Sequence, residues 1–130
     1  MKHIIATLAL VILASLTAFA AGKGAELTFK NASYDLGTIH ASKGKVKATY
    51  DFTNTGTEPL IIVNVTNGGC GCTKPDYPKQ PIAPGKSGKI TITFNPAGRR
   101  GELRREVKVK SNAKNGKRQT LKFTGMIIPD

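Results

Sequence analysis

The sequence predicts an all-β domain, an antiparallel sandwich of about seven short strands. Two observations support this fold class. Apolar residues alternate with polar ones at period two along several short runs, and clusters of turn-forming residues separate these runs. Beyond residue 20, no stretch of the sequence keeps a helical period. For this length and strand spacing, two antiparallel sheets packed around one core are the usual solution.

The alternating runs predict strands with one buried face. The residues expected to point inward are Phe29, Tyr50, Phe52, Ile61, Val63, Ile90, Ile92, Phe94, Val107, Val109, Leu121 and Phe123. Residues 60–63 form a continuous apolar run, which is typical of a strand covered on both faces. Residues 74–84 contain four prolines and cannot donate a full ladder of hydrogen bonds, so this segment is expected to run extended along a sheet edge.

The N-terminus has the pattern of a signal peptide. Lys2 precedes an apolar run over residues 4–16, and Ala18-Phe19-Ala20 has the small-x-small form of a cleavage site. The run is short for a bilayer and lacks a basic stop-transfer cluster, so no retained membrane span is expected. The sequence therefore predicts a signal peptide over residues 1–20, one domain over residues 21–130, and an exported protein, periplasmic or extracellular.

The chain is strongly basic. It has 20 Lys and Arg against 8 Asp and Glu, a net charge of +12 that becomes +11 when Lys2 leaves with the signal peptide. Such a balance raises nucleic acid as a partner, but the basic residues recur at strand spacing, as in Lys108 and Lys110, which is typical of a solvated sheet face. We therefore expect weak contact with anionic surfaces and no specific binding of nucleic acid.

The candidate site is the segment Asn67-Gly68-Gly69-Cys70-Gly71-Cys72-Thr73. Its glycines allow backbone angles closed to other residues, so two thiols could be held at the tip of a tight loop, with Gly68, Gly69, Gly71 and Thr73 as its support. A disulfide between Cys70 and Cys72 requires a bend, which Gly71 would permit. Closing so short a ring removes little unfolded-state entropy, so this bond would be a weak staple.

Three uses of the two thiols stay open. They could form a structural disulfide, bind a soft ion such as Cu(I), or exchange with other thiols. Zinc is poorly supported because a closed site needs four ligands and His40 is the one histidine beyond the signal peptide. The sequence suggests no cofactor other than Cu(I). It also suggests no catalytic residue, because the acidic residues and the serines show no spacing typical of shared catalytic work. Met126, at the end of the last alternating run, is expected to pack in the core rather than act as a third copper ligand.

Several motifs together resemble a known family. They are Asn54-Thr55-Gly56 with Pro59-Leu60, then Cys70-Gly71-Cys72-Thr73, Ile82-x-Pro84-Gly85, Phe94-Asn95, Gly101 and Ser111-Asn112. The chain resembles a small exported bacterial domain of unknown function with an immunoglobulin-like fold, of the hydin and major sperm protein type. The resemblance covers residues 29–127, and the Cys-Gly-Cys-Thr motif is its most specific part. It implies an immunoglobulin-like fold and an exported location, and it implies no catalytic activity.

Two functional hypotheses follow. The first is a non-enzymatic immunoglobulin-like binding or structural module of the bacterial envelope, which contacts an unknown protein or envelope component through loops that include Cys70. The alternative is a protein for copper handling or thiol redox chemistry that acts through Cys70 and Cys72. The redox state of the two thiols, and whether an ion stays bound, would separate these hypotheses.

Overall fold

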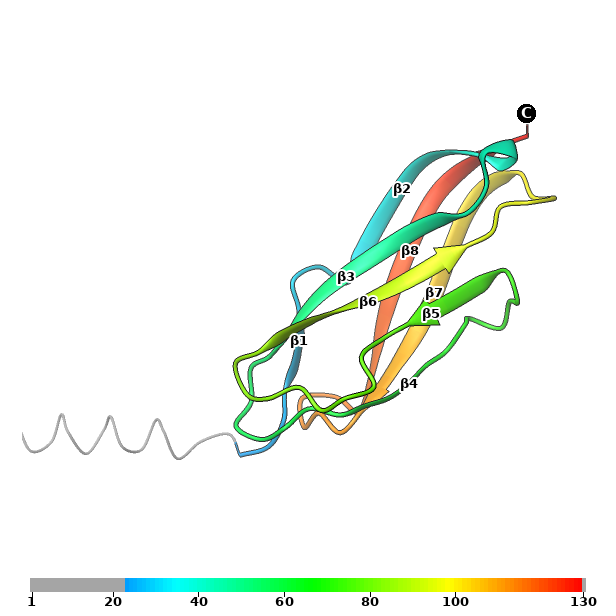
Figure 1. Cartoon of the computed structure of the whole chain (residues 1–130). Helices are drawn as coiled ribbons and strands as arrows, with labels where there is room; N and C mark the ends of the chain where they lie inside the picture. Colours follow the sequence, from blue (N-terminus) through cyan, green and yellow to red (C-terminus); the bar gives the residue numbers. More distant parts are fainter. Residues whose placement is uncertain (1–22, 130) are drawn as a thin grey trace, which may run out of the picture.

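Two four-stranded sheets pack face to face in the computed structural model, which describes residues 23–129 (Figure 1). The predicted signal peptide and its cleavage site lie outside the described residues. The strands are β1 (Leu27–Phe29), β2 (Ser33–His40), β3 (Val46–Asn54), β4 (Ile62–Val65), β5 (Thr73–Asp76), β6 (Ser87–Phe94), β7 (Gly101–Ser111) and β8 (Arg118–Ile128), and a short 3-10 helix, η1 (Ala41–Lys43), follows β2. The all-β sandwich is confirmed, with eight strands where the sequence indicated about seven.

β2 is the strand that the sequence pattern did not reveal. Within it, Ile39 is the one buried residue, so it has no alternation of buried and exposed positions. β2 also pairs in parallel with β8, whereas the other strand pairs described here are antiparallel. The antiparallel sandwich expected from the sequence is confirmed, with one parallel pair among the strand pairs described here. Because β2 and β8 are far apart in sequence, no hairpin turn fixes their relative direction.

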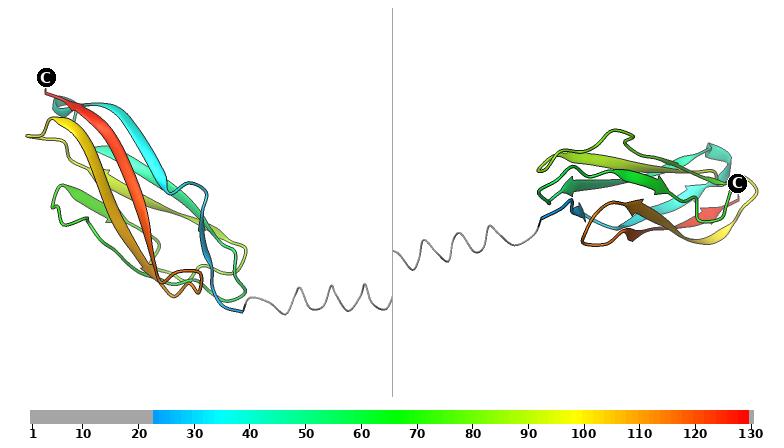
Figure 2. Two further views of the ribbon diagram at one scale, coloured as in Figure 1. Left: turned by 180° about the vertical axis from the view of Figure 1, so that it is seen from behind. Right: turned by 90° about the horizontal axis from the view of Figure 1, so that it is seen from below.

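The strand order is β1-β3-β6-β5 in one sheet, called sheet A here, and β2-β8-β7-β4 in the other, called sheet B. The views from behind and from below show the two sheets as separate layers (Figure 2). β5 lies at an edge of sheet A and β4 at an edge of sheet B. The edge position expected for residues 74–84 is confirmed over β5, which pairs within residues 23–129 with β6 alone, and further along the segment Ile82 forms an isolated bridge with Leu60.

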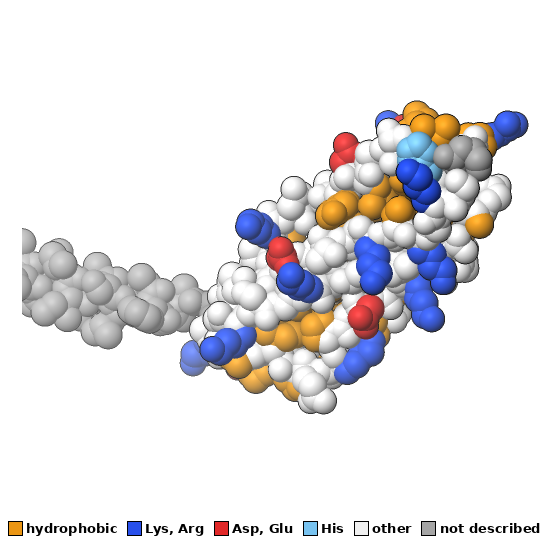
Figure 3. All heavy atoms as spheres, turned by 45° about the horizontal axis from the view of Figure 1, so that its top comes forward, with side chains coloured by type: hydrophobic (Ala, Val, Ile, Leu, Met, Phe, Trp, Pro, Cys, Tyr) orange, Lys and Arg blue, Asp and Glu red, His pale blue; other side chains and the backbone are white. Residues whose placement is uncertain are grey.

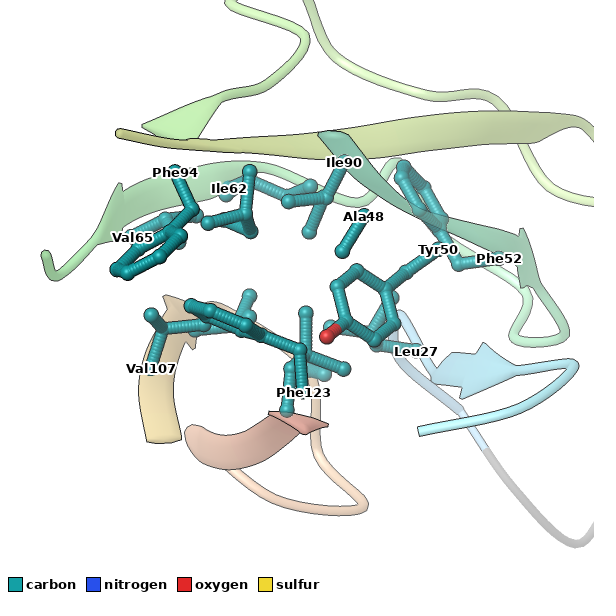
Figure 4. Packing of buried hydrophobic residues seen from close by; sticks show 14 of the residues in the cluster. Leu27, Ala48, Tyr50, Phe52, Ile62, Val65, Ile90, Phe94, Val107 and Phe123 are labelled. Atoms are coloured by element: carbon teal, nitrogen blue, oxygen red, sulfur yellow. The ribbon is translucent and has the colours of Figure 1, made fainter. Parts of the chain in front are cut away.

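Inward side chains from both sheets form one core (Figure 4). The rings of Phe94 and Phe123 meet across it with centroids 6.0 Å apart. Tyr50 is also buried, and its hydroxyl group donates a hydrogen bond of 2.6 Å to the backbone oxygen of Lys122, which links sheet A to sheet B. Burying aromatic and aliphatic area of this kind is the main source of stability for such a domain.

Most of the predicted inward residues are buried, and two predictions in the run over residues 60–63 are wrong. Leu60 and Ile62 are buried, whereas Ile61 is 45% and Val63 56% exposed. The run alternates because the domain has two layers, so this segment has one face on the core and is not covered on both faces. Phe29 is half-buried, and its ring packs on that of Phe52.

The fold also anchors its turns through a buried polar side chain. Asn54 is fully buried, and its amide nitrogen donates to the backbone oxygens of Glu58 and Ile82 at 2.8 and 2.9 Å. Its amide oxygen accepts hydrogen bonds from the backbone nitrogens of Glu26 and Gly56. Met126, in contrast, is 50% exposed, so its expected packing in the core is wrong. No helix within residues 23–129 is long and apolar enough to cross a membrane.

Candidate functional site

The loop between β4 and β5 carries the two cysteines. It leads from an edge strand of sheet B to an edge strand of sheet A, on the right side of Figure 1. Within it, Cys70 and Cys72 lie at disulfide-bonding distance, with their Cα atoms 5.2 Å apart. This spacing is within the usual range for a disulfide. The structure therefore brings together the two thiols that the sequence placed at the tip of a turn.

The three glycines of this loop have different roles. Gly68 and Gly69 have φ angles of 70° and 81°, in the region that favours glycine, and the backbone nitrogen of Gly69 donates to the Asn67 side chain at 2.9 Å. A Cβ atom on Gly68 would lie 2.8 Å from the backbone oxygen of Glu106. Gly71 has no positive φ, and a Cβ atom added there would meet nothing within 4 Å, so the bend between the cysteines does not depend on glycine there, contrary to the expectation.

Backbone hydrogen bonds fix the loop against its surroundings. Thr73, which is buried, donates its backbone nitrogen to the oxygen of Cys70 at 3.2 Å. The backbone nitrogen of Asn95, just after β6, donates to the oxygen of Cys72 at 2.8 Å. The β6–β7 connection thus lies beside the cysteine loop, at the end of the sandwich where β5 begins (Figure 1).

A positive charge from that connection reaches one of the sulfurs. The guanidinium group of Arg99 donates from Nη2 to Sγ of Cys70 at 3.2 Å, and the backbone nitrogen of Cys72 also donates to this sulfur at 3.2 Å. Sγ of Cys72 lies 3.6 Å from the hydroxyl group of Thr73. Sequence reasoning missed Arg99, because the residue follows Cys70 by 29 positions and no motif spacing links them.

A small hollow borders the other cysteine. Its volume is about 110 Å³, and it is lined by Lys45, Gly71, Cys72, Lys74, Thr93 and Asn95. Lys45 and Lys74, which contribute to this lining, are exposed residues. Among residues 23–129 there is no group of three or more His, Cys, Asp or Glu side chains that could hold a metal ion. The local chemistry is therefore that of a disulfide in a cationic environment.

A second surface feature lies along β4. The exposed side chains of Ile61 and Val63 are beside the basic outer face of β7, where Lys110 is the direct neighbour of Asn64 across the strands and Lys108 follows on the same face. The predicted solvated face of Lys108 and Lys110 is thus confirmed. Figure 3 shows Lys and Arg side chains spread over the visible surface and few acidic ones.

Comparisons with known proteins agree with this fold. A family model described as a protein of unknown function (DUF1573) matches residues 27–127. A search of curated proteins found no match. A protein of unknown function from Porphyromonas gingivalis W83 superposes with a TM-score of 0.69 at 18% identity, over 82% of this chain and 48% of that one.

Two further solved structures are similar. The VesB protease of Vibrio cholerae has a TM-score of 0.62 at 17% identity, over 78% of this chain and 32% of the protease. The PapD-like domain 7 of human CEP192 has a TM-score of 0.58 at 15% identity, over 81% of this chain and 87% of that domain. The chain spans less than half of the Porphyromonas protein and of the protease, and at these identities the similarity shows the fold alone. The immunoglobulin-like sandwich expected from the motifs is confirmed.

Proposed function

The chain belongs to DUF1573, a family of proteins of unknown function. On that premise we propose that it is a non-enzymatic immunoglobulin-like module, that it is exported, and that it binds a protein partner of the bacterial envelope. The contact surface is the β4 edge, defined here as Ile61 and Val63 with the neighbouring Lys108 and Lys110. The observation that carries the proposal is the exposure of Val63, at 56%, on the edge strand β4 and of Ile61, at 45%, just before that strand.

Edge strands present backbone donors and acceptors to which an extended segment of another chain can add. Apolar side chains on the same strand give such a segment area to bury. The lysines on β7 add a preference, because a partner segment with acidic side chains would complement their charge. We infer that the partner offers an extended segment with alternating apolar and acidic residues.

Two further parts of the proposal, the non-enzymatic role and the exported location, rest on the ion pairs and on the cysteine pair. Four described carboxylates, those of Glu26, Asp51, Glu102 and Glu106, lie within 4 Å of a Lys or Arg nitrogen, which favours a structural role for them over shared acid–base work. The bonding distance between Cys70 and Cys72 favours an oxidising compartment, since disulfides persist outside the cytosol. The first observation supports a non-enzymatic domain, and the second supports an exported one.

The test uses a photo-crosslinking residue at position 63 in cells that produce the full chain. The control carries the same crosslinking residue at position 28. This position is exposed on β1, which is an edge strand of sheet A, whereas β4 is an edge strand of sheet B. We expect one adduct of defined mass from position 63 and none from position 28. The purified partner should then bind Val63→Lys at least about tenfold more weakly than wild type, while Thr28→Lys binds normally. Adducts at both positions, or equal affinity for both variants, would rule out the β4 edge.

A second candidate function is thiol exchange at Cys70 and Cys72, and the contact between Arg99 and Cys70 favours it. A cationic neighbour stabilises a thiolate, which is the product of disulfide cleavage. The same charge repels a metal cation, so it favours exchange over Cu(I) binding. A comparison of reduced wild type with the Cys70→Ser/Cys72→Ser double variant separates thiol exchange from Cu(I) binding. We expect the two proteins to take up equal amounts of Cu(I). Stoichiometric Cu(I) bound by wild type alone would favour metal handling instead.

A further inference from the structure

The two sulfurs of the Cys70–Cys72 pair have unequal environments. Sγ of Cys70 accepts from the guanidinium group of Arg99 and from the backbone nitrogen of Cys72, each at 3.2 Å. The hydrogen-bonding contact described for Cys72 Sγ is with the neutral hydroxyl group of Thr73, at 3.6 Å. Donors next to sulfur stabilise a thiolate more than a neutral disulfide sulfur, and a charged donor has the larger effect. When the bond breaks, negative charge is therefore better accommodated on Cys70 than on Cys72.

The access to the two sulfurs also differs. The hollow of about 110 Å³ is lined by Cys72, whereas Cys70 does not contribute to it. A water molecule takes about 30 Å³ in the liquid, so this space admits the sulfur end of a small thiol or of a cysteine side chain. Lys45 and Lys74 line the same hollow. Their charges attract an anionic nucleophile towards Cys72, and this attraction weakens as salt is added.

We propose that Cys72 is the sulfur attacked in thiol exchange, that Cys70 is the leaving thiolate held by Arg99, and that the preferred substrates are dithiols flanked by carboxylates. This inference rests on the second candidate function above. It assigns separate roles to two cysteines that are equivalent in the sequence motif.

The chemistry balances as follows. A substrate thiolate forms a bond to Sγ of Cys72, the Cys70–Cys72 bond breaks, and its electron pair stays on Sγ of Cys70 beside Arg99. The second substrate thiol, deprotonated, attacks the substrate sulfur of this mixed disulfide and forms the substrate disulfide. Cys72 leaves as a thiolate and takes up a proton. Two electrons pass from the dithiol to the domain, which acts as the oxidant.

The first test identifies the attacked sulfur. The oxidised full chain is mixed with glutathione, a monothiol with two carboxylates, quenched with acid at early times, alkylated and mapped by mass spectrometry. We expect glutathione on Cys72 and the alkyl group on Cys70. Early modification of Cys70 by glutathione would overturn the assignment while leaving thiol exchange intact. A reaction no faster than that of a simple disulfide such as cystine would overturn both.

The second test measures rates with two thiols of opposite charge, glutathione and cysteamine, compared at equal thiolate concentration. Arg99→Gln should slow the reactions with both thiols about three- to tenfold, because the leaving thiolate loses its charged donor. Arg99→Lys should recover part of the lost rate. The matched control is Arg100→Gln, with the same change of charge at the next position. Lys45→Gln/Lys74→Gln should slow glutathione severalfold at low salt and leave cysteamine unaffected. Equal rates for Arg99→Gln and Arg100→Gln would refute the role of Arg99. If Lys45→Gln/Lys74→Gln slowed glutathione and cysteamine equally, the proposed preference for substrates with carboxylates would be refuted.

Discussion

Tyr50 is a residue whose chemistry depends on the sandwich around it. Its ring is buried in the core, edge-on to that of Tyr34, and its hydroxyl group is bonded to the backbone of β8. Burial disfavours the phenolate and raises the pKa of Tyr50 well above its usual value, and the proximity of Tyr34 raises it further. The folded state therefore keeps Tyr50 protonated at pH values where the unfolded chain loses that proton.

This shift predicts a loss of stability in alkali. An unfolded tyrosine ionises near about pH 10, so above that pH the native state binds more protons than the unfolded state. The contribution of Tyr50 is complete below about pH 10 and decreases as the pH rises towards the folded pKa. Denaturation at about pH 8 and about pH 11 should show that wild type loses about 1 kcal/mol more than Tyr50→Phe, in which lysine titration is the same. Parallel losses in both proteins would contradict the shift.

The loop glycines give a second prediction at this scale. In Gly68→Ala, the new Cβ would meet the oxygen of Glu106 on a backbone with φ of 70°, so we expect a loss of about 1–3 kcal/mol in the free energy of unfolding. Gly71→Ala is the matched control and should change it by less than about 0.5 kcal/mol. Urea denaturation of the two variants measures both values. The sequence could not separate these glycines, because φ depends on the path of the loop past β7.

At the scale of the element, β4 shows what an apolar run leaves undetermined. A run such as residues 60–63 has the same composition whether neighbouring layers cover both of its faces or only one. The two-layer architecture decides the matter, because it leaves each strand with one face on the core, and the place of β4 in sheet B depends on pairing with β7, more than 40 residues later in the sequence. Alternation was informative for β3, β6 and β8, whose outer faces carry polar residues.

Adjacent isoleucines provide the corresponding test. Ile62→Ala removes a side chain that is 5% exposed in the core and should cost about 2–5 kcal/mol in the free energy of unfolding. Ile61→Ala removes the same atoms from an exposed position and should change it by less than about 0.5 kcal/mol. Thermal or urea denaturation compares the two. Similar losses would mean that Ile61 is covered in the folded protein, contrary to the exposure described here.

At the scale of the whole molecule, the sequence was sufficient for the fold class and for the two cysteines, and insufficient for what surrounds them. Period-two runs identify strands by their local chemistry. The parallel pairing of β2 with β8, and the contact of Arg99 with Cys70, join segments whose proximity is a property of the assembled sheets. The glycine-rich motif thus predicted where the candidate site lies, whereas the guanidinium group of Arg99 beside Cys70 is identified by the structure alone.

Export is the prediction that concerns the full chain. The small residues Ala18 and Ala20 after the apolar run predict cleavage after Ala20. Intact mass spectrometry of the protein secreted by its own host should give a chain that starts at Ala21, with two hydrogens fewer than the reduced mass if the disulfide is formed. A mass that retains residues 1–20 would contradict the signal peptide.

The place of β8 in its sheet has a consequence for how the chain can be made. The last strand of the sequence is an interior strand of sheet B, between β2 and β7. Until β8 is present, β2 has no partner in its sheet and the ring of Phe123 is missing from opposite Phe94. A nascent polypeptide whose synthesis has not yet passed residue 128 therefore lacks the strand that joins β2 to the rest of sheet B.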